Sequence, residues 1–454
     1  MTITVINGSP KGKYSITLQT INYLEIKYPD VQFNVLHAGQ MIKSLEKDFS
    51  KAKEILDNSN AIIFSYPVYT FIAPSQLHSF IDLIKKNNVD MSNKYVTQLS
   101  TSKHFYDVTA HKYIEENVLD MGVRYVKGLS ADMDDLLTDK GKDEAEKFLD
   151  RFIWSIENGV FVQGKKTVPS ANRVPVSEYD EMPHDMGKDV VIITDCTDKS
   201  SNLYKMIQRF RNAFTYKTRI VNISELQINA GCLGCFRCAV SGKCVHKDGF
   251  DTYLREHIQN ADAIVYAFEI KDHSMGVRFK MYDDRNFCNG HRTVTEGMPV
   301  GYIVSGDLSK ESNLQMIIEG RAEVGANFLS GIATDEINPD AEIDKLAKSL
   351  AFSLSTKHTC PQNFLGIGGM KIFRDLIWQM RGMMKADHKF YKKHGHYDFP
   401  QKKWYKAYMM YPIGWLLSSE KLLSKMGNKM NEGMLMPYTQ MFEKMDKQNK
   451  KSSK

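Results

Sequence analysis

Cysteine is the residue type whose spacing in this sequence points most clearly to chemistry. Four of the seven cysteines follow a C-x2-C-x2-C-x5-C pattern: Cys232, Cys235, Cys238 and Cys244. Three thiols spaced in this way can wrap one cluster and a fourth can close the cage, which is how proteins hold [4Fe–4S] clusters. Structural zinc sites more often use two separated C-x2-C pairs. The spacing therefore favours a [4Fe–4S] cluster, with Zn²⁺ and reduced thiols without metal as the open alternatives.

A loop of small and hydroxyl-bearing residues follows the first β-branched run. It reads Asn7-Gly-Ser-Pro-Lys-Gly-Lys-Tyr-Ser-Ile-Thr17 and leads into a stretch with helical spacing. The unpaired N–H groups at a helix start attract anions, and Ser and Thr add hydroxyl donors. The loop matches neither G-x-G-x-x-G nor a Walker motif, which argues against a dinucleotide or ATP phosphate. The alternative is an ordinary Ser or Thr helix cap.

Two further loops carry aromatic and hydroxyl side chains. The loop Ser65–Leu77 is stiffened by proline and places Tyr69 where it could stack on a flat ring, and the loop Leu99–Tyr106 adds donors and more aromatics. In an open α/β sheet, ligands bind at the carboxyl ends of the strands, at the point where the strand order reverses. The three loops therefore predict one site for a planar, phosphate-bearing ligand.

The elements that must position these loops alternate between strand and helix. Short β-branched runs at 3–7, 33–37, 61–66 and 95–100 are separated by segments with helical spacing at 15–27, 50–58 and 75–87. This alternation is typical of a doubly wound parallel sheet with helices on both faces. We predict such an α/β domain over residues 1–160.

The same pattern returns later in the chain. Residues 3–8 pair with 190–195 at an offset of 187, and residues 61–64 pair with 263–266 at an offset of 202. The offset grows by 15 residues across the segment that holds the cysteine cluster. We predict a tandem second α/β domain over residues 188–350, with a cysteine-rich insertion and a linker at 161–187 that contains three prolines. Residues 351–454, rich in Met and Lys, are predicted to be helical.

The three loops together resemble those of a known protein family. The patterns G-S-P-x-(x)-S-x-T, P-V-Y with a later F-I-D, and S-T-x-x-x-x-Y resemble the NAD(P)H-dependent FMN reductase and iron–sulfur flavoprotein branch of the flavodoxin-like superfamily. The resemblance implies FMN phosphate contacts at Ser9, Lys11, Ser15, Ile16 and Thr17. It implies isoalloxazine contacts at Pro67, Val68, Tyr69, Thr70, Ser100, Thr101 and Ser102. One departure is Ile16, where the family usually has Asn.

The two predicted domains complement one another. Where the first has Pro67–Thr70, the second has Glu269-Ile-Lys-Asp272, which replaces the stacking aromatic and the proline with charge. An aspartate at position 195 would repel a phosphate in the second domain. One domain thus has flavin loops without cysteines, and the other has cysteines with poor flavin loops. We expect a covalent pseudo-dimer, with one flavin and one cluster in electron-transfer contact across the interface.

Charge and composition restrict the partners and the location. Residues 355–454 hold 19 Lys and Arg against 7 Asp and Glu, so this segment carries +12 and the rest of the chain −6. No basic patch lies on a recognisable nucleic-acid-binding fold, so nucleic acid is not an expected partner. The basic segment predicts either a helical cap over the domains or an interfacial helix at a membrane. An odd, clustered set of cysteines suits a reducing compartment, and we expect a cytoplasmic protein.

The expected function follows from the resemblance. NAD(P)H would deliver hydride to FMN, and the electrons would pass to a quinone-like, nitro or protein acceptor, with the [4Fe–4S] cluster as an intermediate carrier. The flavin supplies this chemistry, so no catalytic side chain is predicted. Two alternatives stay open: a non-enzymatic electron carrier of the flavodoxin–ferredoxin type, and a cofactor-free interaction protein with a zinc site.

Overall fold

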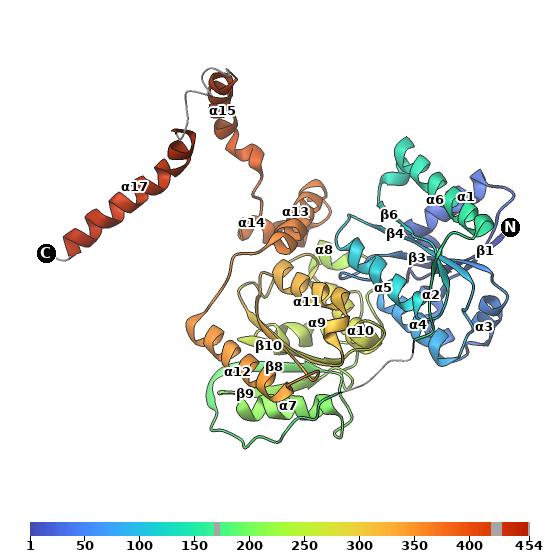
Figure 1. Ribbon diagram of the computed structural model, residues 1–454, viewed down its shortest axis with the longest axis horizontal. Coiled ribbons are helices and arrows are strands. Elements are labelled where there is room, and N and C mark those ends of the chain that lie inside the picture. Colours follow the sequence, from blue (N-terminus) through green and yellow to red (C-terminus); the bar gives the residue numbers. More distant parts are fainter. Residues whose placement is uncertain (168–172, 419–428, 453–454) are drawn as a thin grey trace. The chain divides into compact units, whose positions relative to one another are not determined.

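A computed structural model describes residues 1–167, 173–418 and 429–452. The chain divides into two compact units, Met1–Lys393 and His394–Lys454. The first unit contains two parallel β-sheets with helices packed on both (Figure 1). No helix among the described residues is long and apolar enough to cross a membrane.

The first sheet has the strand order β2-β1-β3-β4-β5-β7, with β6 paired to β4. Its strands are β1 (Thr2–Asn7), β2 (Gln32–Leu36), β3 (Ala61–Pro67), β4 (Tyr95–Ser102), β5 (Arg124–Tyr125), β6 (Leu129–Asp132) and β7 (Val162–Gln163). All pairs are parallel except β5 with β7. The helices of this domain are α1 (Ile16–Lys27), α2 (Ala38–Leu45), α3 (Ser50–Asp57), α4 (Ser75–Lys86), α5 (Asp107–Leu119) and α6 (Asp139–Asn158).

The second sheet repeats this order as β9-β8-β10-β11-β12, with every pair parallel. Its strands are β8 (Asp185–Thr194), β9 (Tyr216–Asn222), β10 (Ala263–Glu269), β11 (Pro299–Ser305) and β12 (Phe328–Thr334). Its helices are α7 (Asn202–Ala213), α8 (Arg237–Ser241), α9 (Phe250–Tyr253), α10 (Gly276–Arg285), α11 (Ser312–Val324) and α12 (Pro339–Thr356). The predicted fold class, two flavodoxin-like parallel sheets followed by helices, is confirmed.

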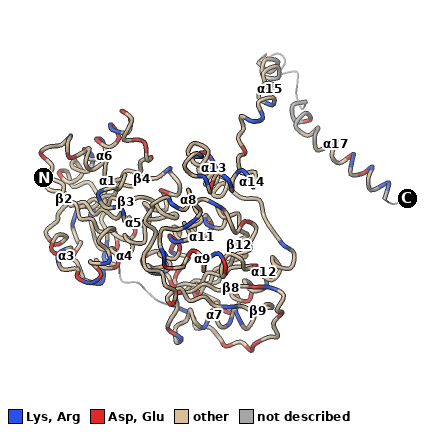
Figure 2. Tube along the Cα trace, turned by 180° about the vertical axis from the view of Figure 1, so that it is seen from behind, with Lys and Arg blue, Asp and Glu red and all other residues tan. Residues whose placement is uncertain are grey.

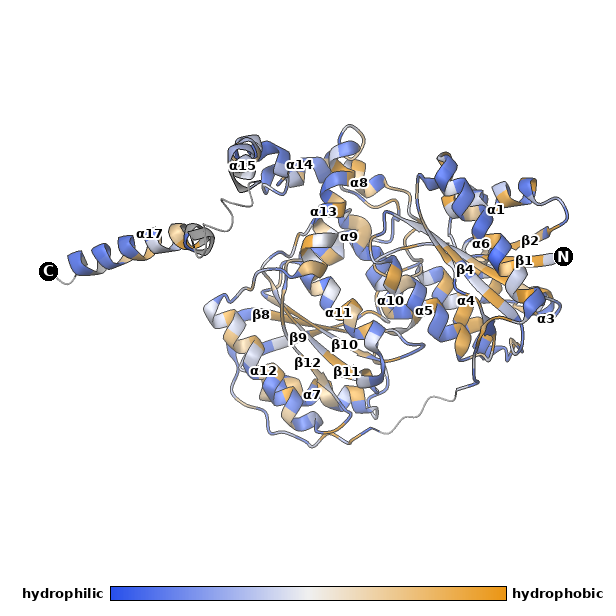
Figure 3. Cartoon of the chain, turned by 45° about the horizontal axis from the view of Figure 1, so that its top comes forward, coloured by the Kyte–Doolittle hydropathy of each residue, from blue (hydrophilic) through white to orange (hydrophobic). Residues whose placement is uncertain are grey.

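The strands form because their sequences are apolar on both faces. Strands β1, β3 and β11 are buried along almost their whole length, which is typical of parallel strands covered by helices on either side. Figure 3 shows this as apolar strands between amphipathic helices. Separate apolar clusters lie under the outer helices of each sheet, and one continuous core joins the inner faces of both.

The inner helices hold the two domains together. Helix α4 of the first domain packs against α10 of the second, and α5 packs against α11. Because β3–α4 and β10–α10 are equivalent elements of the two sheets, this arrangement has an approximate twofold character. Whether the likeness reflects a tandem duplication stays a prediction, although the shared strand order is what a duplication would produce.

The predicted boundaries can be located on these elements. Strand β7 and the start of β8 lie inside the predicted linker at 161–187, and the predicted end of the second domain at residue 350 lies inside α12. Helices α13 (Phe364–Gln379) and α14 (Lys385–Lys393) belong to the same compact unit as both sheets. The predicted third region therefore includes helices that pack with the α/β domains.

The second unit contains α15 (Trp404–Leu417) and α17 (Lys429–Ser452). Lysines gather toward the C-terminal end of α17 (Figure 2). Contact of this segment with a membrane stays a prediction.

Candidate functional site

One cavity of the first unit is lined by loops from both domains. The carboxyl ends of β1, β3 and β4 contribute all of the predicted flavin residues except Ser100: Ser9, Lys11, Ser15, Ile16, Thr17, Pro67, Val68, Tyr69, Thr70, Thr101 and Ser102. The insertion of the second domain contributes all four clustered cysteines: Cys232, Cys235, Cys238 and Cys244. The two sets of residues that the sequence singled out separately thus face the same space.

The loop after β1 is built to bind an anion. Asn7 holds it in shape, because its Nδ2 donates to the carbonyl oxygen of Gly12 at 2.9 Å and its Oδ1 accepts from the backbone N–H of Ser9 at 3.1 Å. Ser15 precedes α1, but its hydroxyl makes no capping hydrogen bond. The Ser15 Oγ is buried and has no hydrogen-bond partner. A buried hydroxyl without a partner costs stability, and here it leaves the Ser15 Oγ available to bind a ligand in the cavity that it lines.

Threonines join the phosphate loop to the end of β4. Thr17 Oγ1 lies 2.6 Å from Thr101 Oγ1, and both side chains are buried. The backbone N–H of Val68 donates to the carbonyl oxygen of Thr101 at 3.2 Å, which ties the loop after β3 to the same point. The hydroxyl of Ser100 instead hydrogen-bonds His111 Nε2 at 2.7 Å. The Ser100 side chain is therefore engaged beneath the cavity, because successive side chains of a strand point to opposite faces.

The flavin loop of the first domain is held by the second domain. Thr70 and Phe71 adopt left-handed backbone conformations, with φ of 40° and 73°. Lys280 Nζ donates to the carbonyl oxygen of Tyr69 at 2.7 Å, and Thr70 Oγ1 donates to Asp284 at 2.5 Å. Lys280 and Asp284 are fully buried and pair with each other at 2.6 Å. This ion pair on α10 stabilises a strained loop that belongs to the other domain.

The cysteine loop lies directly on this aromatic loop. Gly234 has φ of +61°, and a Cβ atom at that position would come within 1.8 Å of the Tyr69 hydroxyl. Only glycine fits there, because both the conformation and the space exclude a side chain. Burial, with Cys232 and Asp284 nearby, raises the pKa of Tyr69 well above its usual range. Tyr69 is therefore a neutral phenol under the cysteine loop.

The cysteine loop has the features of a thiolate site. The backbone N–H of Gly234 donates to Cys232 Sγ at 3.4 Å, the kind of N–H···S contact that surrounds metal-bound sulfur. Burial raises the pKa of Cys232, and it raises the pKa of Cys238 to about 11. Without a metal these two thiols stay protonated at neutral pH, whereas a bound cation would hold them as thiolates. Burial lowers the pKa of Lys11, and the adjacent Cys235 and Cys232 oppose that shift.

Sequence reasoning missed several residues of this cavity. Cys288 is buried and lines it outside the cysteine motif, and His291 lines it a few residues later. His291 Nδ1 lies 2.9 Å from Asp387, a fully buried carboxylate on α14. Phe373 of α13 lines the same space, with its ring 4.4 Å from Phe105 and 4.8 Å from His291. These residues lie on separate elements, so their spacing along the chain carries no recognisable motif.

The corresponding edge of the second sheet is occupied by the linker. Arg173 pairs with Glu269 at the end of β10 at 2.5 Å. The backbone N–H of Val174 donates to the carbonyl oxygen of Asp335, after β12, at 2.9 Å, and Asn202 Nδ2 donates to the Val174 carbonyl oxygen at 2.9 Å. The linker therefore lies where a flavin of the second domain would bind, which supports the prediction that this domain has a poor flavin site.

Comparisons with known proteins agree with the first domain. Residues 1–128 match the family described as NADPH-dependent FMN reductase. The iron–sulfur flavoprotein of Archaeoglobus fulgidus is 26% identical over 191 residues, which cover 40% of this chain and 85% of that protein. The family match and this relative confirm the predicted resemblance and the oxidoreductase class that it implies.

Solved structures of similar proteins cover about one domain of this chain. The apo form of the NADH:FMN oxidoreductase EMOB is 21% identical, with a TM-score of 0.31, and covers 34% of this chain and 89% of its own. The NAD(P)H:acceptor oxidoreductase FerB of Paracoccus denitrificans is 18% identical, with a TM-score of 0.30, and covers 35% and 97%. The general stress protein 14 of Treponema denticola, solved with FMN, is 11% identical, with a TM-score of 0.29, and covers 34% and 98%.

Proposed function

We propose that this protein is an NAD(P)H-dependent FMN oxidoreductase in which one FMN and one [4Fe–4S] cluster share the cavity between the two domains. The observation that carries the proposal is the lining of that cavity, which combines the flavin loops of the first domain with all four clustered cysteines of the second. Electrons would pass to a quinone-like or nitro compound or to a protein. The family match supports the flavin reductase class, and the cluster and the acceptor are our finer proposals.

The residues present fit FMN. The phosphate would meet the Ser15 hydroxyl, which has no other partner, the N–H groups at the start of α1, and the Lys11 ammonium. The flat ring would lie against Pro67–Thr70, a loop that Lys280 and Asp284 hold in place. When bound, FMN supplies hydride acceptance from NAD(P)H and electron transfer to an acceptor.

The donor set of the second domain fits an iron–sulfur cluster. Cys232, Cys235, Cys238 and Cys244 all line the cavity, and Gly234 donates a hydrogen bond to the Cys232 sulfur. The close approach of Gly234 to Tyr69 brings this loop to the flavin loop. Electron transfer between two groups held by these loops would need no movement of either domain.

The third side of the cavity suits a flat, apolar acceptor. This side is lined by His291 and by four apolar side chains: Phe105, Ile372, Phe373 and Leu376. Reduction of a quinone or nitro group consumes protons as well as electrons. We infer that His291 donates a proton at this wall and that Asp387 orients its ring through Nδ1, as a carboxylate does in other carboxylate–histidine pairs. This assigns a candidate catalytic residue where sequence reasoning named none.

The spectrum of protein purified without oxygen tests this proposal and separates it from the two alternatives. We expect flavin bands with a broad iron–sulfur shoulder, equal amounts of FMN and chain, and rapid bleaching of the flavin by NADH or NADPH. Flavin without bleaching by either nucleotide would favour a non-enzymatic electron carrier. Colourless protein that contains zinc would favour the interaction protein and would overturn the proposal.

A further inference from the structure

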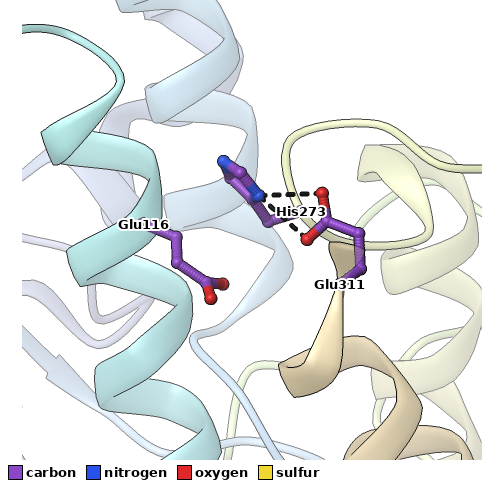
Figure 4. Close-up of side chains that lie close together, drawn as sticks. All are labelled: Glu116, His273 and Glu311. Carbon is purple, nitrogen blue, oxygen red and sulfur yellow. Dashed lines mark hydrogen bonds and ion pairs between the residues drawn. The ribbon is translucent and has the colours of Figure 1, made fainter. Parts of the chain in front are cut away.

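Three side chains of types that can bind a metal ion lie close together at the interface of the two domains, and none of them lines the flavin cavity (Figure 4). Glu116 comes from α5 of the first domain. His273 comes from the loop after β10, and Glu311 directly precedes α11, both in the second domain. One ligand atom from each of the three residues lies within 4.8 Å of the other two. The group is partly buried, with side-chain exposures of 17%, 21% and 15% respectively.

His273 is oriented in the way that metal-bound histidines are. Its Nε2 lies 2.9 Å from Asp120, the residue directly after α5, which holds the plane of the ring. Its Nδ1 faces Glu311, with the two carboxylate oxygens at 3.0 and 2.9 Å. Histidines that bind a metal through one ring nitrogen commonly donate the other N–H to a carboxylate, which fixes the tautomer and the ring orientation.

Hydrogen bonding within the group leaves Glu116 unexplained. Its Oε2 is buried without a hydrogen-bond partner, and its other oxygen lies 4.0 Å from Lys112. Three carboxylates, from Glu116, Asp120 and Glu311, surround one imidazole. A divalent cation among these carboxylates would be balanced by their charge, and it would give the buried Glu116 Oε2 the partner that it lacks.

At the equivalent position of the first domain, a positively charged side chain lies next to the loop. Phe71 occupies the same place in its loop as His273 does in the second domain, and both residues have left-handed φ, 73° and 57°. The Arg321 guanidinium lies over the Phe71 ring at 5.7 Å and pairs with Asp283. A protein cation thus bridges the domains on the flavin side. On the other side, the loop with His273 faces Glu116 of α5 and Asp120, the residue directly after that helix.

We propose that Glu116, His273 and Glu311 form a site for a divalent transition-metal ion, of the Zn²⁺ class, that clamps the two domains together. One imidazole and two carboxylates are ligands that Zn²⁺ and its neighbours accept, and three protein ligands leave a position for water. Asp120 is the positioning residue. Bonds of about 2.0–2.2 Å would require only a small closure of the group around the ion.

A proton is the competing cation at this site. The ring nitrogens of His273 lie within 3.0 Å of Asp120 and Glu311, so a protonated imidazole paired with both carboxylates is the alternative to a metal site. That alternative leaves the Glu116 Oε2 without a partner, whereas an ion between the three side chains would give it one.

Titration of the anaerobic full-length holoprotein with Co²⁺ decides between them. Cobalt bound by the cysteines gives an intense thiolate-to-metal charge-transfer band, whereas cobalt bound by imidazole and carboxylates gives only weaker ligand-field bands. We expect one Co²⁺ per chain without the charge-transfer band, displaced by Zn²⁺. His273→Phe, which installs the residue type of Phe71, should abolish this uptake, and Asp120→Asn should weaken it by about 10- to 100-fold.

A matched control is His104→Gln. His104 also pairs with a carboxylate, Asp107 at 2.9 Å, but it belongs to no such group, so this variant should bind Co²⁺ as the unmodified protein does. If His273→Phe does not fold, Co²⁺ uptake is measured on Glu116→Gln instead. This substitution preserves the size of the side chain and breaks no hydrogen bond at Oε2, because that oxygen has no partner. The proposal would be overturned if the unmodified protein bound no Co²⁺ outside the cysteines. It would also be overturned if the folded His273→Phe or Glu116→Gln variant bound as much Co²⁺ as the unmodified protein.

Discussion

The two sheets have the same strand order, but their carboxyl edges differ: one opens onto a cavity and the other is covered by the linker. At the edge of β1 and β3 the loops open onto a cavity, and the hydroxyl of Ser15 before α1 has no partner. At the equivalent edge of the second sheet, Arg173 of the linker pairs with Glu269 at the end of β10, and the backbone N–H of Val174 donates to the carbonyl oxygen of Asp335 after β12. There the hydroxyl of Ser201 before α7 accepts from the backbone N–H of Tyr204 at 3.2 Å. The same topology thus supports a ligand site or a closed surface, depending on the loops.

The second domain, whose flavin loops are predicted to be poor, contributes residues to the cavity at the edge of the first sheet. Its insertion supplies the cysteines, its α10 supplies the ion pair that holds Tyr69 and Thr70, and α14 supplies the carboxylate that orients His291. The second domain therefore supplies side chains to the cavity and to the loop contacts of the first domain. Differences between matched variants of the two domains should therefore be large and specific.

Removal of a proposed cluster ligand should have the largest effect on acceptor reduction. We expect Cys235→Ser, purified without oxygen, to lose its iron and sulfide while it retains FMN and bleaching by NAD(P)H. Reduction of the acceptor should fall to background if electrons pass through the cluster. Cys360→Ser, which alters an exposed cysteine far from this motif in sequence, is the control and should retain its iron. Retention of full iron by Cys235→Ser would exclude this cysteine as a ligand.

Substitution of two lysines that make hydrogen bonds across the interface, Lys280 and Lys85, should lower the free energy of unfolding by very different amounts. Lys280→Met leaves Asp284 buried and unpaired, and we expect it to lower the free energy of unfolding by about 3–5 kcal/mol and to weaken FMN binding. Lys85 pairs with Asp272 at 2.7 Å in the other direction, but both side chains are partly exposed. Lys85→Met should cost about 1 kcal/mol or less. Denaturant titration and flavin retention measure both, and equal losses would contradict the asymmetry.

The pair His291–Asp387 should separate the two half-reactions. We expect His291→Gln to slow reduction of a quinone by about 10²-fold, because a positioned proton donor contributes on that scale. Bleaching of the flavin by NAD(P)H should be unchanged. Asp387→Asn should shift the pH profile of acceptor reduction and leave flavin content intact. Stopped-flow measurement of each half-reaction is the test, and an equal loss in both would indicate a structural role.

Substitution of the two serines that precede equivalent helices, Ser15 and Ser201, should have the smallest effects. One should change FMN affinity and the other should change stability. Ser15→Ala removes a donor to the phosphate and should weaken FMN binding by about 1 kcal/mol, with little loss of stability. Ser201→Ala removes a helix cap and should cost about 1 kcal/mol of stability without an effect on FMN. Fluorescence titration with FMN and thermal unfolding distinguish them. If Ser15→Ala lost stability and kept FMN affinity, Ser15 would be a cap as well.

Local patterns in the sequence were sufficient to predict the elements and to single out residues that line one cavity, whereas the chemistry of those residues stays a prediction. The β-branched run Ile3–Asn7 and the glycine–hydroxyl loop after it act over a few residues, so their structure follows from nearest-neighbour physics. The same holds for the cysteine spacing, since ligand reach along one loop is a local property. The repeat offsets also identified equivalent elements, because two parallel sheets of the same order need the same succession of strands and helices.

Only the tertiary structure decided how these parts meet. Nothing local in Lys280 or Asp284 indicates that they bind a loop some 210 residues away, and nothing in Arg173 and Val174 indicates that the linker covers the second sheet edge. The side chain of Ser100 faces His111 because the strand alternates, which a family motif does not specify. The cavity, the His291–Asp387 pair and the Glu116–His273–Glu311 group each depend on contacts between distant elements. Such contacts form through packing of the whole core, so the sequence by itself determined the components and the fold determined the site.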